Sequence, residues 1–355
     1  MSGADPRVLI FNWHEPYLAL LARTGGDFLV ADWHRRWSAA CRPLPANAQL
    51  VSDPEQARAL LEGAGIDLVL CQTPADLDWS APYPGPIVYL AHNRLENEVR
   101  GQPAGAAAAL RERVRARLEA AGGRFVAISE MKRASWDLGG VVIPPGVDLA
   151  EYGGWTGEEA RALTVANLIV ERDHMLGYSR LAAALTDLPW RIVGTNPALG
   201  VSEAESWPAL RAAYRTHRLY AHATQWPWED GWNLALLEAM ATGMPVVTWA
   251  NPTGPLREGL EGFVARDAQT FRRRAGQLLE DPALGRRLGE LARKRVAECF
   301  PLDAFCERWR AVLLEAADPA RPSWRGARPA SGDPGPAASS AASGLDAAAV
   351  CGPRA

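Results

Sequence analysis

Residues 229–248 constrain the fold of this 355-residue chain more than any other stretch. A loop of acidic, glycine and aromatic residues comes first. Apolar side chains then recur at positions i, i+3 and i+7, which are Leu234, Leu237 and Ala241. This spacing is typical of a helix with one buried face. Gly243 marks the end of the helix, and residues 246–248 have the composition of a buried strand. The stretch therefore predicts a loop, a short helix and a strand in immediate succession.

Two carboxylates in this stretch are the first candidate site residues. The helical neighbours of Glu238 at three and four positions include no cation, so its charge needs a partner from elsewhere. Asp230 lies eight residues earlier, roughly 12 Å along a helix axis, near the N–H groups that a helix start leaves free. The pair predicts acceptors for both ends of an extended polyhydroxyl ligand, with anion-binding amides between them. The alternative is that Asp230 is an N-cap and Glu238 a core acid.

The order of residues adds a family resemblance. Acid-Gly-aromatic-x-Leu-x-x-Leu-Glu-Ala-Met-Ala-x-Gly-x-Pro-Val-Val resembles the signature of retaining glycosyltransferases of the GT-B fold, family 4 (group 1) type. The resemblance implies that Glu238 binds the nucleotide ribose. It also implies that the loop and helix start hold the donor sugar, through Asp230, Gly231, Trp232, Asn233 and Leu234. The family usually has Glu at position 230 and often Gly at 233, so the identity of the sugar is not predicted. Glu229 is an alternative first acid, although its spacing is one residue longer.

Strand and helix signals alternate along the rest of the chain, which predicts an α/β protein with parallel sheets. The resemblance implies a GT-B fold, in which two Rossmann-like, doubly wound domains face a central cleft. We expect an N-terminal acceptor-binding domain at 1–155 and a C-terminal nucleotide-sugar-binding domain at 156–317, whose final helix crosses back to the first. Residues 318–355 are rich in Pro, Ala, Gly and Ser, and are predicted to be a disordered tail.

Two histidines are candidates in the first domain, because ligands of parallel sheets bind beyond the carboxyl ends of strands. His14 follows the first predicted strand, and His92 follows the strand predicted at 86–90. The resemblance implies that His92 contacts the donor sugar and serves in catalysis, whereas His14 rests on its position alone. In each case the alternative is a histidine that only packs within the domain.

In the second domain, residues 162–173 resemble the family's strand that ends in Gly-Arg-Leu, with a Lys five residues after the Arg. In the family, these two cations hold the diphosphate. Aligned on Leu168, the chain has Asn167 at the Arg position and Arg172 at the Lys position. The resemblance therefore implies substrate binding at both positions but only one diphosphate-binding cation, Arg172. The alternative for Arg172 is an ordinary surface arginine.

Charge and hydropathy narrow the expected partners. A net charge of -3 and a pI near 6.1 argue against nucleic-acid binding. The N-terminus lacks a signal-peptide pattern, and no stretch approaches 18 apolar residues, so we expect a cytoplasmic protein. Four arginines alternate along a predicted helix between Arg111 and Arg117. They are expected to form a solvated face; the alternative is a weak peripheral contact with the inner membrane face.

The function predicted from sequence is a retaining glycosyltransferase that moves a hexose from a nucleotide diphosphate sugar to a glycan, lipid-linked or small-molecule acceptor. His92, Arg172 and Asp230 are the expected catalytic residues. No metal or other cofactor is expected, because no His/Asp cluster with metal-ligand spacing occurs in the sequence. The alternatives are a catalytically silent homologue that serves as a binding subunit, favoured by Asn167, and a nucleotide-sugar hydrolase or epimerase.

Overall fold

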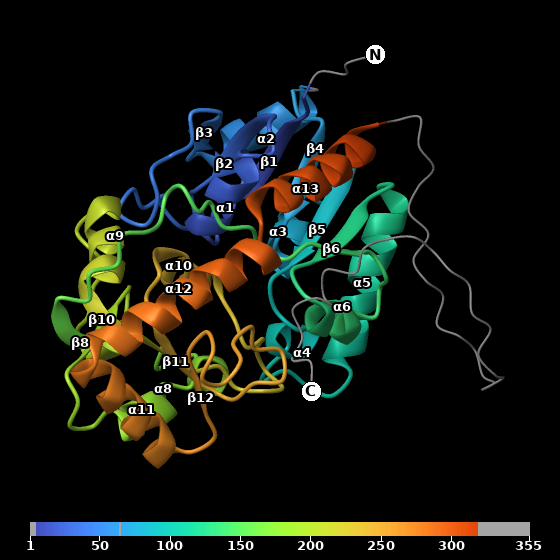
Figure 1. Cartoon of the computed structure of the whole chain (residues 1–355). Helices are drawn as coiled ribbons and strands as arrows, with labels where there is room; N and C mark the ends of the chain where they lie inside the picture. Colours follow the sequence, from blue (N-terminus) through green and yellow to red (C-terminus); the bar gives the residue numbers. More distant parts are fainter. Residues whose placement is uncertain (1–4, 64, 319–355) are drawn as a thin grey trace, which may run out of the picture.

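The computed structural model describes residues 5–63 and 65–318 and contains two parallel β-sheets with helices packed around them (Figure 1). The tail predicted at 318–355 lies outside the described residues, apart from Asp318. The two sheets lie on either side of the helix that the sequence predicted after residue 233 (Figure 1).

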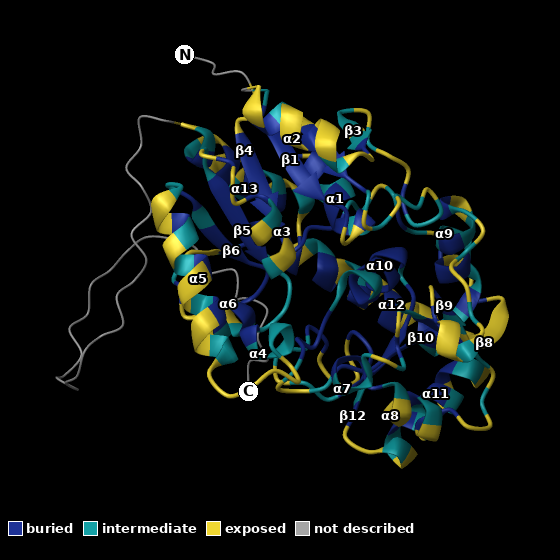
Figure 2. Cartoon of the chain, turned by 180° about the vertical axis from the view of Figure 1, so that it is seen from behind, coloured by how far each residue is buried: buried dark blue, intermediate teal, exposed yellow. Residues whose placement is uncertain are grey.

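Seven strands form the first sheet, in the order β3-β2-β1-β4-β5-β6-β7, and all neighbours pair in parallel. Every residue of β4 and β5 is buried (Figure 2), as expected for a parallel sheet covered on both faces. The strand order reverses between β1 and β4, which opens a crevice beyond their carboxyl ends. The strands are β1 (Arg7–Phe11), β2 (Asp27–Ala31), β3 (Ala48–Val51), β4 (Leu68–Cys71), β5 (Ile87–Ala91), β6 (Arg124–Ala127) and β7 (Val141–Val142).

Three helices of this first unit begin at residues whose side chains accept hydrogen bonds from free backbone N–H groups. Asp53, Thr73 and Ser129 act in this way at α2, α3 and α6. α1, α2 and α3 also have proline in the first turn, where its missing N–H has no helical partner to lose. The helices are α1 (Glu15–Ala22), α2 (Pro54–Glu62), α3 (Pro74–Trp79), α4 (Leu95–Glu98), α5 (Ala106–Ala120) and α6 (Glu130–Trp136).

Five strands form the second sheet, in the order β12-β11-β10-β8-β9, again all parallel. Its strand order reverses between β8 and β10, so a second crevice opens there. The strands are β8 (Glu159–Val165), β9 (Trp190–Val193), β10 (His217–His222), β11 (Val246–Trp249) and β12 (Phe263–Ala265). The remaining elements are α7 (Asp173–Leu176), α8 (Tyr178–Ala184), η1 (Pro197–Leu199), α9 (Trp207–Thr216), α10 (Leu234–Thr242), α11 (Ala268–Glu280), α12 (Pro282–Cys299) and α13 (Leu302–Ala317).

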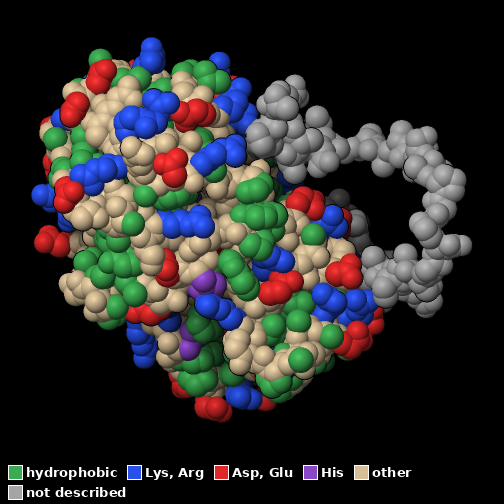
Figure 3. All heavy atoms as spheres, turned by 90° about the horizontal axis from the view of Figure 1, so that it is seen from below, with side chains coloured by type: hydrophobic (Ala, Val, Ile, Leu, Met, Phe, Trp, Pro, Cys, Tyr) green, Lys and Arg blue, Asp and Glu red, His purple; other side chains and the backbone are tan. Residues whose placement is uncertain are grey.

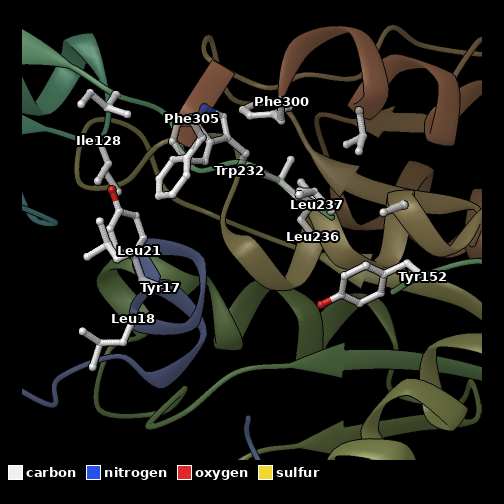
Figure 4. Packing of buried hydrophobic residues seen from close by; sticks show 14 of the residues in the cluster. Tyr17, Leu18, Leu21, Ile128, Tyr152, Trp232, Leu236, Leu237, Phe300 and Phe305 are labelled. Carbon is white, nitrogen blue, oxygen red and sulfur yellow. The ribbon is translucent and has the colours of Figure 1, made fainter. Parts of the chain in front are cut away.

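Helices α12 and α13 connect the two units. α12 packs on α10, whereas α13 returns to the first unit and lies along α1, β4 and β5 (Figure 1). Trp309 of α13 donates a hydrogen bond from Nε1 to the hydroxyl of Tyr17 at 3.1 Å. Figure 4 shows the apolar cluster that results, in which Tyr17, Phe305 and Trp232 come from three distant parts of the chain. One continuous core therefore fixes how the two crevices face each other.

Candidate functional site

The carboxyl ends of β1, β4 and β5 supply three polar side chains to the cleft from the first sheet. Gln72 follows β4, and its Nε2 donates to the Phe11 carbonyl at 2.6 Å. The Gln72 Oε1 is therefore the acceptor that lies 2.8 Å from His92 Nε2. His92 must carry its proton on Nε2, which leaves Nδ1 as a hydrogen-bond acceptor. Burial, followed by the charges of His14 and Lys132, keeps the pKa of His92 well below its usual value, so the ring is neutral.

His14 lies beside His92, with the ring centroids 6.1 Å apart. The His14 side chain is open to solvent, yet the surrounding protein and the charges of Arg35, Arg172 and Arg42 lower its pKa. Three arginines from both units thus surround one neutral imidazole. Figure 3 shows histidine side chains in purple beside basic side chains in blue, along a hollow of the surface. The structure thus places both predicted histidines next to each other and near three arginines, two of which pair with acids of their own, Arg35 with Glu15 and Arg42 with Glu238.

Arg172 enters this cleft from the second unit. It follows β8 and directly precedes α7, after a turn in which Leu168 has a φ of 53°. Burial lowers the pKa of the Arg172 guanidinium, and Glu229 is the acid whose charge opposes that shift. Within residues 5–63 and 65–318, the Arg172 side chain makes no hydrogen bond or ion pair. Arg172 is partly buried, and a partly buried cation without a partner is stabilised when an anion binds beside it.

Asn167, the other predicted diphosphate position, has a role within the protein. Its Oδ1 accepts a hydrogen bond from the Thr195 N–H at 2.8 Å, which ties the exit of β8 to the loop after β9. Glycine is required at position 194 of this loop, because a Cβ there would lie 2.7 Å from Asn167 Oδ1 and closer still to the Ala166 carbonyl. The amide therefore holds the loop, and Arg172 is the cation of this segment.

The loop before α10 differs from the predicted geometry. α10 begins at Leu234, and Asn233 is its N-cap, with Oδ1 accepting from the Leu236 N–H at 2.9 Å. Asp230 is therefore not on the helix, so both the expected 12 Å helical separation from Glu238 and the alternative of an Asp230 N-cap are wrong. The reason is that Gly231 lies against the backbone of Gly254, where a Cβ would collide, and its N–H donates to the Thr253 hydroxyl at 2.7 Å.

Asp230 and Glu229 share one cation from the first unit. Lys132 Nζ lies 2.6 Å from Glu229 Oε1 and 3.0 Å from Asp230 Oδ2, and all three side chains are buried. Burial alone would lower the pKa of Lys132, but the two carboxylates outweigh it and raise the pKa. Asp230 Oδ1 has no hydrogen-bond partner among the described residues. This oxygen is thus a free acceptor at the predicted sugar-binding position.

Glu238 has the partners that its own helix lacks. Its Oε1 forms an ion pair with Arg42 of the first unit, and its Oε2 accepts from the Tyr214 hydroxyl at 3.0 Å. Arg42 also lies over the Trp207 ring, 3.6 Å from the centroid. As expected, α10 itself has no cation near Glu238. The loop that connects β2 and β3 supplies one.

The two remaining residues predicted to bind the sugar, Trp232 and Leu234, lie in different surroundings. The Trp232 ring is buried against Phe300, with centroids 5.6 Å apart, so its indole belongs to the core. Leu234 lines a cavity of about 400 Å³ together with Glu238 and Arg42. His14, His92 and Arg172 do not line this cavity; they lie near one another, with His14 beside His92 and within range of the charge of Arg172.

Arg42, Lys132 and Gln72 were missed by sequence reasoning. Arg42 lies in a loop without helical or strand periodicity, which gave no signal. Lys132 lies on α6, shortly after β6, and as one of the two lysines in the sequence it was a usable signal. Gln72 ends β4 at the reversal of strand order, so the rule that pointed to His14 also pointed to this residue.

The arginines of α5 are engaged within the protein. Arg111 and Arg117 donate to backbone carbonyls, Arg113 pairs with Asp78 at 3.4 Å, and Arg115 pairs with Glu112 at 3.5 Å. These contacts give the predicted basic face a structural role. No helix in the described part of the chain is long and apolar enough to cross a membrane. The described ranges also contain no group of three or more His, Cys, Asp or Glu residues that could hold a metal ion.

Part of the second unit matches a known protein family. Residues 181–281 match the family described as "Glycosyl transferases group 1". No curated protein matches the chain. Among solved structures, HepE from Anabaena in complex with UDP-glucose is similar over 87% of this chain and 99% of its own, with a TM-score of 0.63 and 16% identity.

Two further structures show the same fold. Sucrose-phosphate synthase from Thermosynechococcus elongatus matches with a TM-score of 0.58 and 16% identity, over 85% of this chain and 97% of its own. TarM from S. aureus matches with a TM-score of 0.52 and 15% identity, over 69% of this chain. The match spans 54% of the length of TarM. These findings confirm the predicted α/β GT-B fold and the predicted resemblance to group 1 glycosyltransferases.

Proposed function

We propose that this protein is a glycosyltransferase that moves a hexose from a nucleoside diphosphate sugar to an acceptor hydroxyl with retention of configuration. The single observation that supports this function most is the partly buried Arg172 guanidinium, which has no hydrogen-bond or ion-pair partner among the described residues and lies near the neutral His14 and His92. A diphosphate is the kind of anion that such an arginine binds with two parallel hydrogen bonds. HepE, which shares the fold, has been solved with UDP-glucose.

The polar groups around Arg172 match the other parts of a sugar nucleotide. Glu238 is proposed to accept hydrogen bonds from the ribose hydroxyls. The free Oδ1 of Asp230 and the Nδ1 of His92 are acceptors for sugar hydroxyls. His92 and Asp230 are both oriented before the ligand binds, because Gln72 contacts His92 and Lys132 pairs with Asp230.

Charge develops on the diphosphate as the bond to the sugar breaks. Arg172 donates to that charge, and the first-turn N–H groups of α10 supply further donors nearby. We propose that this chemistry proceeds without a metal ion, because Arg172 and the helix amides neutralise the leaving group directly. The acceptor is proposed to bind on the first unit, near His14, where the cleft is open to solvent.

A thermal-shift panel of UDP-, GDP- and ADP-sugars tests the proposal, followed by a product assay on each sugar nucleotide that stabilises the protein. We expect stabilisation by one nucleotide class and transfer of the sugar to an added acceptor. Stabilisation without turnover would instead favour a binding subunit, and sugar release without an acceptor would favour a hydrolase. No stabilisation by any of the sugar nucleotides would contradict the proposed function.

A further inference from the structure

The loop between β2 and β3, residues 32–47, crosses from the first unit to the second. Ser38 donates from its hydroxyl to Glu203 Oε2 at 2.9 Å, and the Cys41 thiol lies 3.2 Å from the same oxygen. Arg42 reaches further, to Glu238 and to the Tyr152 hydroxyl at 2.7 Å. The loop thus spans the cleft at the position where the proposed ribose site lies.

Glu238 has little capacity left for a ligand in this arrangement. Arg42 occupies Oε1 and Tyr214 occupies Oε2, and the carboxylate is only 5% exposed. Ribose hydroxyls are donors to the same oxygens that Arg42 now uses. A sugar nucleotide therefore competes with the Arg42 guanidinium for Glu238.

We propose that Arg42 is an autoinhibitory latch that occupies the ribose-binding position of Glu238 until a nucleoside diphosphate displaces it. The inference rests on the proposed role of Glu238 in ribose binding. Room for the displaced side chain exists, because Arg42 lines the cavity of about 400 Å³ that also contains Asp148 and Glu151. These two carboxylates pair with the half-exposed Arg23 at 2.7 and 3.5 Å, and they can share the Arg42 guanidinium with it once Arg42 leaves Glu238.

A latch of this kind lowers the apparent affinity for nucleotide by the fraction of molecules in which it is open. Arg42→Ala removes the competitor and is expected to tighten nucleoside diphosphate binding by about tenfold or more. Glu203→Ala leaves Arg42 and Glu238 in place but releases Ser38 and Cys41 from the second unit. It is expected to raise the affinity for nucleotide less, by about two- to fivefold, because only two exposed contacts are lost.

Calorimetry with UDP, GDP and ADP on the wild type, Arg42→Ala and Glu203→Ala measures these gains. Glu205→Ala is the matched control, because Glu205 is an exposed acid two residues further on whose side chain forms no hydrogen bond or ion pair with the described residues. Its affinity is expected to equal that of the wild type. Glu203→Ala keeps the inference testable should Arg42→Ala fail to fold.

A comparison of UDP with 2′-deoxy-UDP then tests whether the latch acts at the ribose. The gain in Arg42→Ala is expected to be smaller for the deoxynucleotide, which has one hydroxyl fewer for Glu238. An equal gain would overturn the assignment of Arg42 to the ribose position. Should the wild type bind UDP and both variants bind it no more tightly, the latch is wrong while the proposed function stands. Should none of the proteins bind any nucleotide, both the latch and the proposed function are wrong.

Discussion

Lys132 and Glu229 are 97 residues apart in the sequence, and their side chains form an ion pair with Nζ 2.6 Å from Oε1. The pair joins α6 of the first unit to the loop that precedes α10. Asp230 completes it at 3.0 Å. Because the lysine and both acids are buried, each depends on the others for the hydrogen bonds that water would otherwise supply.

Lys132→Met is therefore expected to destabilise the protein strongly, by about 3–5 kcal/mol, because it leaves two buried carboxylates without a cation. Urea unfolding followed by tryptophan fluorescence measures the change. Lys294→Met is the matched control, since Lys294 is exposed on α12 and is the other lysine of the chain. It is expected to change stability by less than about 0.5 kcal/mol. A similar small effect at Lys132 would mean that the two acids are neutral or hydrated.

The sequence was informative where local rules and the structure agree. The i, i+3, i+7 spacing predicted α10 and its end at Gly243, and the strand alternation indicated the two parallel sheets. The rule that parallel sheets bind ligands beyond the carboxyl ends of their strands brought His14 and His92 to the cleft. These features depend on contacts within an element or on the order of elements, both of which a sequence displays.

Contacts between the two units were beyond the reach of sequence reasoning. The charge of Glu238 is balanced by Arg42, 196 residues away, and no local pattern relates the two. The position of Asp230 was misjudged for a similar reason, since the packing of Gly231 against Gly254 delays the start of α10. The conformations of the loops that form the site therefore depend on tertiary packing, and their functional residues can be identified only from the folded structure.

The pH dependence of stability should reveal His222, which is 3% exposed at the end of β10. Burial lowers its pKa from 6.5 to about 3, so the folded protein holds it neutral while the unfolded chain protonates it below pH 6.5. The stability that the neutral His222 contributes is thus fully present above pH 6.5 and is lost as the pH falls toward 3. At pH 5 the loss from this residue is about 2 kcal/mol.

His222→Gln removes this contribution. We expect the variant to lose less stability than the wild type between pH 7.5 and pH 5, measured by urea unfolding at each pH. The comparison uses the difference between the two slopes, so acidic groups common to both proteins cancel. Equal slopes would show that the imidazole becomes protonated in the folded state without cost.

Glu238→Gln tests the proposed ribose site. Loss of the charged acceptor is expected to weaken UDP-sugar binding by about 1.5–3 kcal/mol, the value of a hydrogen bond to a charged group. The variant is also expected to lose stability, because Arg42 loses its ionic partner in a buried position. Calorimetry measures the first effect and thermal unfolding the second. Glu280→Gln, an exposed acid at the end of α11, is the control for both. Unchanged affinity in Glu238→Gln would make Glu238 a structural acid.

Arg172→Ala tests which charge stabilises the leaving diphosphate. The Arg172 side chain makes no hydrogen bond or ion pair with the described residues, so its removal is expected to cost little stability. Turnover is expected to fall about a hundredfold or more, because the interaction strengthens as the bond to the sugar breaks. Arg100→Ala is a comparison variant, since Arg100 is exposed and contacts the His174 ring at the surface. Steady-state kinetics on both variants, with thermal unfolding alongside, separates lost chemistry from lost folding.

The same assay with EDTA distinguishes an arginine from a metal ion as the group that neutralises the diphosphate. If Arg172 does so together with the helix amides of α10, EDTA is expected to leave the rate of the wild type unchanged. Asn167→Arg is not expected to add a second useful cation, because Asn167 Oδ1 accepts the Thr195 N–H and its loss would loosen the loop after β9. Should EDTA abolish activity while Arg172→Ala retains it, a metal ion carries the charge of the leaving group, and the role proposed for Arg172 is wrong.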